Sequence, residues 1–152
     1  MSRKTTTRLT DTIDDLKRHN DFLALLMDEL RDLLEGASDF ENRRPILTTL
    51  DALLVNLRQQ FELEEKGGYL EDVLDRYPNW HPQVVHLRQQ HALLRQQLCQ
   101  ARNRIATLSP DEPVGHEIER QLVDWMNTYG EHRHRETALI QDAFALETGV
   151  GE

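Results

Sequence analysis

The chain has 152 residues, of which 38% are apolar and 30% are charged, a composition typical of one globular domain with a sizeable core. Its formal net charge of −9 argues against non-specific nucleic-acid binding, for which basic surfaces are expected. Because its single cysteine, Cys99, cannot form an internal disulfide and no stretch resembles a signal peptide or a membrane span, we expect a cytoplasmic protein that binds no membrane.

The first predicted element is a helix from about residue 10 to residue 35. Apolar residues recur along it every three or four positions, as they do on one face of a helix, and Gly36 is a natural stop. The segment 37–44 is expected to be a loop. The expected inward positions are Leu16, His19, Leu23, Leu26, Leu30 and Leu33.

The second predicted helix opens near Pro45, a residue suited to a first helical turn. Gly67 and Gly68 weaken a helix interior by about 1 kcal/mol each, but the apolar pattern resumes beyond them. We therefore expect one helix, bent at the glycines, that ends at Pro78. Its inward positions are Ile46, Leu50, Leu53, Leu57, Gln60, Phe61 and Glu64.

The third predicted helix begins within residues 79–82 and carries the cleanest alternation of three and four in the chain. Its inward positions are Val84, Leu87, His91, Leu94, Leu98, Ala101, Ile105 and Leu108.

The fourth predicted helix opens with a capping box, in which Ser109 and Glu112 flank Pro110 at the first helical position. Its inward positions are Ile118, Leu122, Trp125, Tyr129, His132, Glu136, Leu139 and Ala143, and the tail from residue 148 is expected to fray. Short connections between long helices imply antiparallel neighbours. The fold expected is therefore all-α: one antiparallel up-down-up-down four-helix bundle over residues 1–152, with its core within about residues 10–146.

Polar residues occupy some of these inward positions in every helix: His19, Gln60, Glu64, His91, His132 and Glu136. Burying one unpaired carboxylate costs several kcal/mol, whereas a whole domain has only about 5–15 kcal/mol of net stability. Counted from the helix ends, these residues lie at about the same height in all four predicted helices, provided that the fourth helix becomes regular near Gly115. We therefore expect them to meet in one polar site in the core.

This set of side chains suits a metal ion. His132 and Glu136 are spaced i,i+4 and share one helix face, and imidazole with carboxylate is a ligand set for non-haem iron. Each signal has an ordinary alternative. A lone core histidine such as His91 is more often a hydrogen-bonded structural residue, a lone His-x-x-x-Glu pair is more often on the surface, and Glu64 would be solvated if its helix face is misassigned. Their coincidence at one height favours the metal.

Four segments resemble the hemerythrin-like (HHE cation-binding) domains, over roughly residues 11–144. They are 16–19, which ends in His19; 61–70, the most specific, which contains Glu64; 87–94, which contains His91; and 132–136, which begins with His132 and ends with Glu136. The resemblance implies a hemerythrin-like bundle in which these five residues are metal ligands, with Glu64 and Glu136 bridging. It also implies two non-haem iron ions that bind or sense dioxygen, nitric oxide or iron itself.

The sequence departs from the family pattern at two positions. Gln60 stands where the family usually has a histidine, which leaves His19 as the only matched nitrogen ligand on its half of the site. Leu87 stands where some hemerythrins carry another histidine, a loss that need not abolish binding. Gln60, Glu65 or a water molecule could substitute for the missing ligand. The centre could also hold one iron ion or another metal, load weakly, or be empty.

Other residues near the predicted site are expected to support it or to lie outside it. His86 and Tyr129 are candidates to hydrogen-bond a ligand, although Tyr129 fits equally a core aromatic. Cys99 is expected to be partly buried. The remaining histidines, His81, His116 and His134, are expected on the surface.

Three functions compete on these observations. The first is a metal-binding protein that binds or senses a small diatomic ligand such as dioxygen or nitric oxide. The second is a metal-free or weakly loaded structural or interaction bundle, which Gln60 favours. The third is an oxidase-like or peroxidase-like enzyme. The sequence leaves open the metal, a protein partner, and the choice between monomer and dimer.

Overall fold

The computed structural model describes the backbone of residues 2–36, 39–65 and 69–147, and within them every side chain except those of 2–13, 16, 69–70, 72–73, 140 and 143–147. These residues contain helices and no strand, so the all-helical prediction is confirmed for this part of the chain. The helices are α1 (Ser2–Glu35), α2 (Arg43–Glu65), α3 (Tyr69–Arg76), α4 (His81–Ala106) and α5 (Gly115–Glu147). Two short 3₁₀ helices, η1 (Phe40–Asn42) and η2 (Pro78–Trp80), precede α2 and α4.

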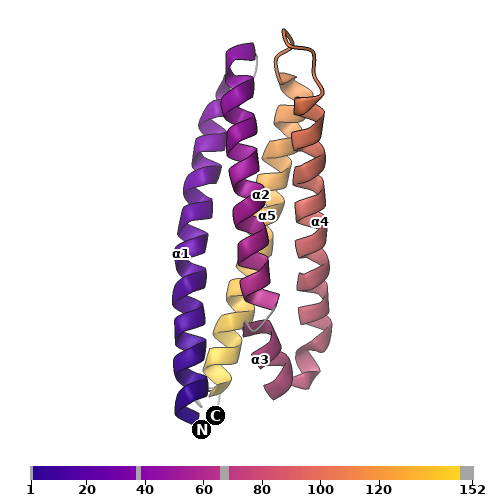
Figure 1. Cartoon of the computed structure of the whole chain (residues 1–152). Helices are drawn as coiled ribbons and strands as arrows, with labels where there is room; N and C mark the ends of the chain where they lie inside the picture. The colour runs from indigo at the N-terminus through magenta and orange to yellow at the C-terminus, as the bar shows by residue number, and fades with distance from the viewer. Residues whose placement is uncertain (1, 37–38, 66–68, 148–152) are drawn as a thin grey trace.

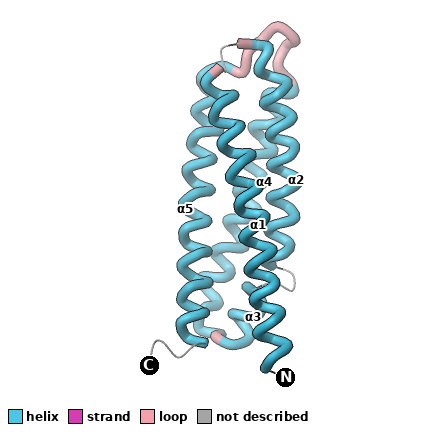
Figure 2. The backbone as a smooth tube through the Cα atoms, turned by 90° about the vertical axis from the view of Figure 1, so that its left-hand side faces the viewer, coloured by secondary structure: helices cyan, strands magenta, loops and turns pink. Residues whose placement is uncertain are grey.

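The four long helices α1, α2, α4 and α5 lie side by side (Figure 1), and Figure 2 shows the same arrangement from the side. α1 packs against α2, α2 against α4, and α4 against α5, while α1 also contacts α5. The end of α1, the start of α2 and the loop between α4 and α5 lie at one end of the molecule, and the short helix α3 lies at the other end with the start of α1 and the end of α5 (Figure 1). No helix in the described part of the chain is both long and apolar enough to cross a bilayer.

The second helix differs from its prediction. α2 ends at Glu65, and a separate helix, α3, begins at Tyr69, so the expectation of one helix running to Pro78 is wrong. Gly67 and Gly68, on which that expectation depended, lie outside the described residues. Because α2 ends one residue after Glu64, the polar residues of this helix belong to its last turns.

The start of the last helix also differs, and the capping-box prediction is wrong. The Glu112 N–H donates to the Ser109 carbonyl (2.9 Å), which closes a turn, and α5 begins only at Gly115. Pro113 disfavours helical backbone at the residue before it, which explains the delay. Gly115 has a φ of 80°, a conformation that glycine adopts without strain.

The apolar core occupies the half of the assembly nearest the two long-helix connections, where the predicted inward residues are buried. On α4, seven of the eight are buried and only Leu108 is half-buried. On α1, Leu34 is buried and Leu33 half-buried. The Trp125 indole N–H donates to the Leu94 carbonyl (2.8 Å), which joins α5 to α4 one turn beyond His91.

Candidate metal centre

Five of the six predicted inward polar residues are buried, with 1–5% of their surface exposed: Gln60, Glu64, His91, His132 and Glu136. They come from the end of α2, the first half of α4 and the second half of α5. Contacts among them, described below, confirm that these three helices bring polar side chains to a common height. Whether they ligate a metal remains a prediction.

Three of these side chains form a compact group around one carboxylate oxygen. Oε1 of Glu136 lies 2.5 Å from Nε2 of His91 and 2.5 Å from Nε2 of His132. The two imidazole rings meet nearly edge to face, with centroids 4.8 Å apart and an angle of 71° between their planes. One ligand atom from each of the three residues lies within 4.8 Å of the other two.

Glu64 joins this group from α2. Its Oε2 lies 3.0 Å from Nε2 of His91, which is within ion-pair distance, but the angles of this contact are not those of a hydrogen bond. Glu64 and Glu136 therefore both face the same ring nitrogen of His91. The alternative that Glu64 faces solvent is therefore wrong, because only 1% of its surface is exposed. His91 thus lies between two carboxylates that approach from different helices.

Two neighbours fix the orientation of the imidazole rings. Nδ1 of His132 donates to Oε1 of Gln90 (2.7 Å), which leaves Nε2 directed at Glu136. Phe61 stacks on the ring of His91, with centroids 3.9 Å apart and planes within 5°. A hydrogen bond from the far nitrogen is how proteins hold a histidine ligand in its binding tautomer. Gln90 was not among the predicted site residues, and its position next to His91 is the only sequence signal for it.

The described contact between α1 and these residues is made by Asn20, whereas the role of His19 as a ligand remains a prediction. The Nε2 of Gln60 donates to Oδ1 of Asn20 and to Oε1 of Glu64 (3.1 Å). His19 is half-buried and is not a member of the compact group, so the structure does not bring it together with His91, His132 and Glu136. Asn20 therefore contributes the α1 contact with Gln60.

The remaining predicted neighbours occupy three different places. Glu65 is half-buried, and its Oε1 lies 3.5 Å from Nδ1 of His91, on the opposite side of the ring from Glu136. His86 is exposed and lines an outer groove of about 400 Å³ between α4 and α5, so its expected role beside the centre is wrong. Tyr129 is buried and stacks on Trp125. His81, His116 and His134 are exposed, as predicted.

Burial and proximity drive the two carboxylates to opposite protonation states. Burial raises the pKa of Glu64 to about 8, and the negative charge of Glu136 adds to this effect. Burial alone would also raise the pKa of Glu136, but hydrogen bonds from His132 and His91 outweigh it and lower that pKa to about 2. Burial opposes the charge on His91, yet the adjacent carboxyl groups of Glu136 and Glu64 raise its pKa to about 10. At neutral pH, these shifts favour a charged His91, an ionised Glu136 and a protonated Glu64.

The donor set fits a metal ion chemically. Two imidazoles and one carboxylate, with further positions open, form the set that non-haem iron(II) sites use. Neighbouring ligand atoms on one ion are about 3 Å apart when each bond is about 2.1 Å long. The three ligand atoms of this centre lie within 4.8 Å of one another, so small side-chain rotations would bring them to that spacing.

Several buried polar atoms around the group also lack hydrogen bonds within the described part of the chain. They are Gln60 Oε1, Glu64 Oε2, His91 Nδ1 and the Tyr129 hydroxyl. A buried polar atom left without a partner costs about 1–3 kcal/mol. These four atoms belong to residues in or next to the His91–Glu136 contact, so the unsatisfied hydrogen-bonding capacity of the core is concentrated there.

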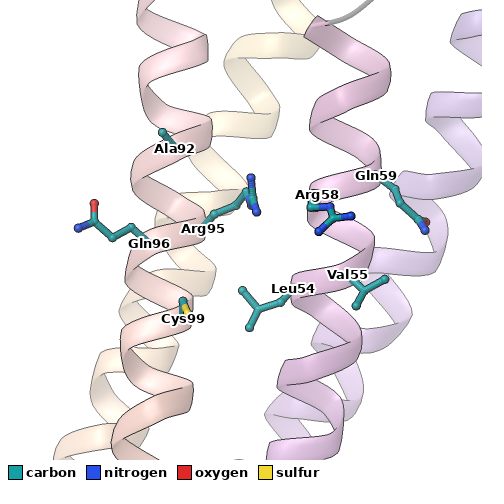
Figure 3. Close-up of a pocket in the computed structure, with 8 residues that line it drawn as sticks. All are labelled: Leu54, Val55, Arg58, Gln59, Ala92, Arg95, Gln96 and Cys99. Carbon is teal, nitrogen blue, oxygen red and sulfur yellow. The ribbon is translucent and has the colours of Figure 1, made fainter.

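A second groove, on the outer surface between α2 and α4, is separate from this centre (Figure 3). It has a volume of about 540 Å³, and Arg58 and Arg95 stand on its two sides. Its lining residue Ala92 directly follows His91 but is exposed, because neighbouring residues point to different sides of a helix. Cys99 also lines the groove and is exposed, contrary to the expectation that it is partly buried.

The sequence matches no protein-family model, and neither the curated proteins nor the solved structures contain a match. The interpretation of the centre therefore depends on its own geometry and chemistry.

Proposed function

We propose that this chain is a metal-binding protein in which His91, His132 and Glu136, supported by Glu64, hold one non-haem iron ion that binds or senses a small diatomic ligand. The observation that carries the proposal is the buried group of two histidines and one carboxylate, whose ligand atoms lie within 4.8 Å of one another. Imidazole and carboxylate in this ratio, with open positions, favour iron(II) among the common metals. A bound ferrous ion would supply the open positions at which dioxygen or nitric oxide binds.

The charges around the group favour one divalent ion over two. Glu64 and Glu136 are the two carboxylates buried against His91. One divalent ion would neutralise both carboxylates if His91 binds as a neutral imidazole, whereas a second would leave uncompensated positive charge in a dry site. The position of a second ion also lacks its ligands, because Gln60 is engaged by Asn20 and His19 is outside the group.

We further propose that the chain belongs with the hemerythrin-like domains and that α1, α2, α4 and α5 form an antiparallel up-down-up-down four-helix bundle of that kind, with α3 as an addition. The support is the order in which the long helices pack and the placement of the polar residues on three of them. In this proposal Gln60 marks a site reduced from two ions to one.

Iron binding tests the proposal directly. Chain stripped with a chelator is titrated anaerobically with ferrous iron, followed by calorimetry, elemental analysis and thermal unfolding. We expect one iron per chain and a rise in unfolding free energy of about 2.7 kcal/mol when free iron is at a hundred times Kd. Nitric oxide added to the loaded protein should then change its absorption spectrum.

The matched variants are Glu136→Gln and Glu119→Gln, both on α5. Glu136 is in the group, whereas Glu119 hydrogen-bonds His116 at the surface (3.1 Å). Glu136→Gln should weaken iron binding by more than the roughly 10–100-fold that is typical of losing a residue that only supports a ligand. Glu119→Gln should bind iron as the parent does. Equal iron affinity in the two variants would show that iron binds elsewhere.

A metal-free interaction bundle is the second candidate, and one observation favours it. The chain Gln90–His132–Glu136–His91 is continuous through hydrogen bonds of 2.7, 2.5 and 2.5 Å without any ion. Such a network can hold a polar core by itself. Protein that takes up no iron, and whose melting is unchanged by ferrous iron, would support this candidate and end the first.

A further inference from the structure

Two buried side chains beside the centre have hydrogen-bonding atoms that the described structure leaves unused. Neither the Tyr129 hydroxyl nor the Oε1 of Gln60 has a hydrogen bond of good geometry among the described residues, although the two residues are only 2% and 1% exposed and the Gln60 side chain lies close enough to act on the hydroxyl. The Gln60 amide nitrogen is held by Asn20 and Glu64, so this side chain cannot turn to use its oxygen elsewhere. Burial also raises the pKa of Tyr129, so the hydroxyl keeps its proton.

Both residues lie one helical turn from the centre, toward the α1–α2 connection. Gln60 is four residues before Glu64 on α2, and Tyr129 is three residues before His132 on α5. Since such spacings place side chains on the same helix face, each residue lies directly beside a member of the centre. Gln60 and Glu64 both act on the ionisation of Tyr129, as expected for immediate neighbours.

Apolar residues close this side of the centre. Leu57 precedes Gln60 by one turn, Leu94 follows His91 by one turn, and these residues are 0% and 2% exposed. Trp125 stacks on Tyr129 with ring centroids 5.6 Å apart, which fixes the phenol ring. Because protein interiors are closely packed, apolar walls of this kind would admit only a ligand of a few atoms beside the hydroxyl.

We propose that Tyr129 and Gln60 form a subsite for a two- or three-atom ligand bound beside the ion, in which the Tyr129 hydroxyl donates a hydrogen bond to the ligand's outer atom. This inference rests on the metal centre proposed above. The ligand class is a small hydrogen-bond acceptor, either a polarised diatomic molecule or a small anion. The hydroxyl gains its missing partner when the ligand arrives, so the subsite favours a ligand that accepts a hydrogen bond over one that cannot.

Azide is the probe for the experiment, because it has three atoms and accepts hydrogen bonds. Iron-loaded protein is oxidised to the ferric state, and azide is titrated into it by absorbance, in the parent and in Tyr129→Phe. The substitution removes only the hydroxyl. One hydrogen bond to a charged acceptor in a dry site makes a difference of roughly tenfold in Kd or more, so Tyr129→Phe should bind azide at least tenfold more weakly.

Two controls separate the possible outcomes. Tyr77→Phe changes a half-buried tyrosine beside Trp80 and should leave azide binding unchanged. The iron affinity of Tyr129→Phe should equal that of the parent, because Tyr129 only contacts the added ligand. Azide that binds the parent and Tyr129→Phe equally, with iron bound to both, would overturn the subsite alone. Protein that takes up no iron would overturn the metal centre, and the subsite with it.

Discussion

The two ends of the helical core are built on different principles. Toward the α1–α2 and α4–α5 connections, the core consists of fully buried apolar residues such as Leu30, Leu50, Leu98 and Leu122. Beyond Tyr129, the core becomes a polar centre in which His91 and Glu136 depend on specific partners. Apolar packing stabilises at any pH, whereas the polar centre makes stability depend on protons and, in the proposal above, on a bound ion. Within one set of helices, the apolar half of the core therefore stabilises the fold, and the polar half forms the candidate binding site.

The largest effect is expected from a cavity in the apolar end. Leu50→Ala should lower the free energy of unfolding by about 2–5 kcal/mol, because Leu50 is 0% exposed and its removal leaves a void. Urea denaturation of metal-free protein measures the loss. Leu93→Ala, at a residue 52% exposed on α4, should change stability by no more than about 0.5 kcal/mol. Equal losses in the two variants would contradict the division between core and surface.

The next effect is the pH dependence of the metal-free protein. The pKa values of Glu64 and His91 are raised in the folded state, from 4.5 to about 8 and from 6.5 to about 10. Their stabilising contributions are complete below the unfolded values and are lost as pH rises through the folded ones. The free energy of unfolding should therefore fall by about 2 kcal/mol per pH unit between pH 7 and pH 9.

Bound iron should oppose this loss of stability with rising pH. Because only the polar end of the core contains the proposed site, the effect of iron distinguishes that end from the apolar end. Ligands must lose their protons before they bind a metal, so iron affinity should rise over the same pH range. Denaturation curves at several pH values, with and without ferrous iron, measure both slopes. A metal-free protein whose stability does not change between pH 7 and pH 9 would contradict the protonation states described for the centre.

A smaller effect is expected from the residue that orients His132. Gln90→Leu should weaken iron binding roughly 10–100-fold, because Nδ1 of His132 loses its acceptor at 2.7 Å and the ring is free to turn. Gln89→Leu changes the exposed neighbour and is the matched control. Competition with a coloured chelator measures both affinities. If the two variants bind iron alike, the Gln90 contact does not support the centre.

The smallest effect is expected from restoring the histidine that the sequence lacks. Gln60→His should tighten iron binding by about 1 kcal/mol, or about fivefold, because an imidazole nitrogen is a stronger ligand for iron than an amide oxygen. The gain is limited because the change also removes the Gln60 contacts with Asn20 and Glu64. Iron titration of both forms provides the measurement, and equal affinity and stoichiometry would count against the prediction.

Helical periodicity was sufficient to predict most of the fold and of the centre. It predicted the burial of His91, His132 and Glu136, because polar residues within a regular apolar stripe must face the core. The break between α2 and α3 was missed, since the apolar pattern continues through it. The capping box predicted too early a start for the last helix, whereas the start near Gly115 that the height of His132 requires is confirmed. Several local signals can each mark a helix boundary, and the packing of the folded chain determines where the helix begins or ends.

What the sequence alone determined is which face of each helix a residue occupies, because the turn of about 100° per residue is a local property of the backbone. Tertiary structure alone decided the partners: that Asn20 rather than His19 meets Gln60, that Gln90 holds His132, and that His86 points outward. Those pairings depend on the rotation and axial shift of neighbouring helices. Both are set by the packing of all their side chains together.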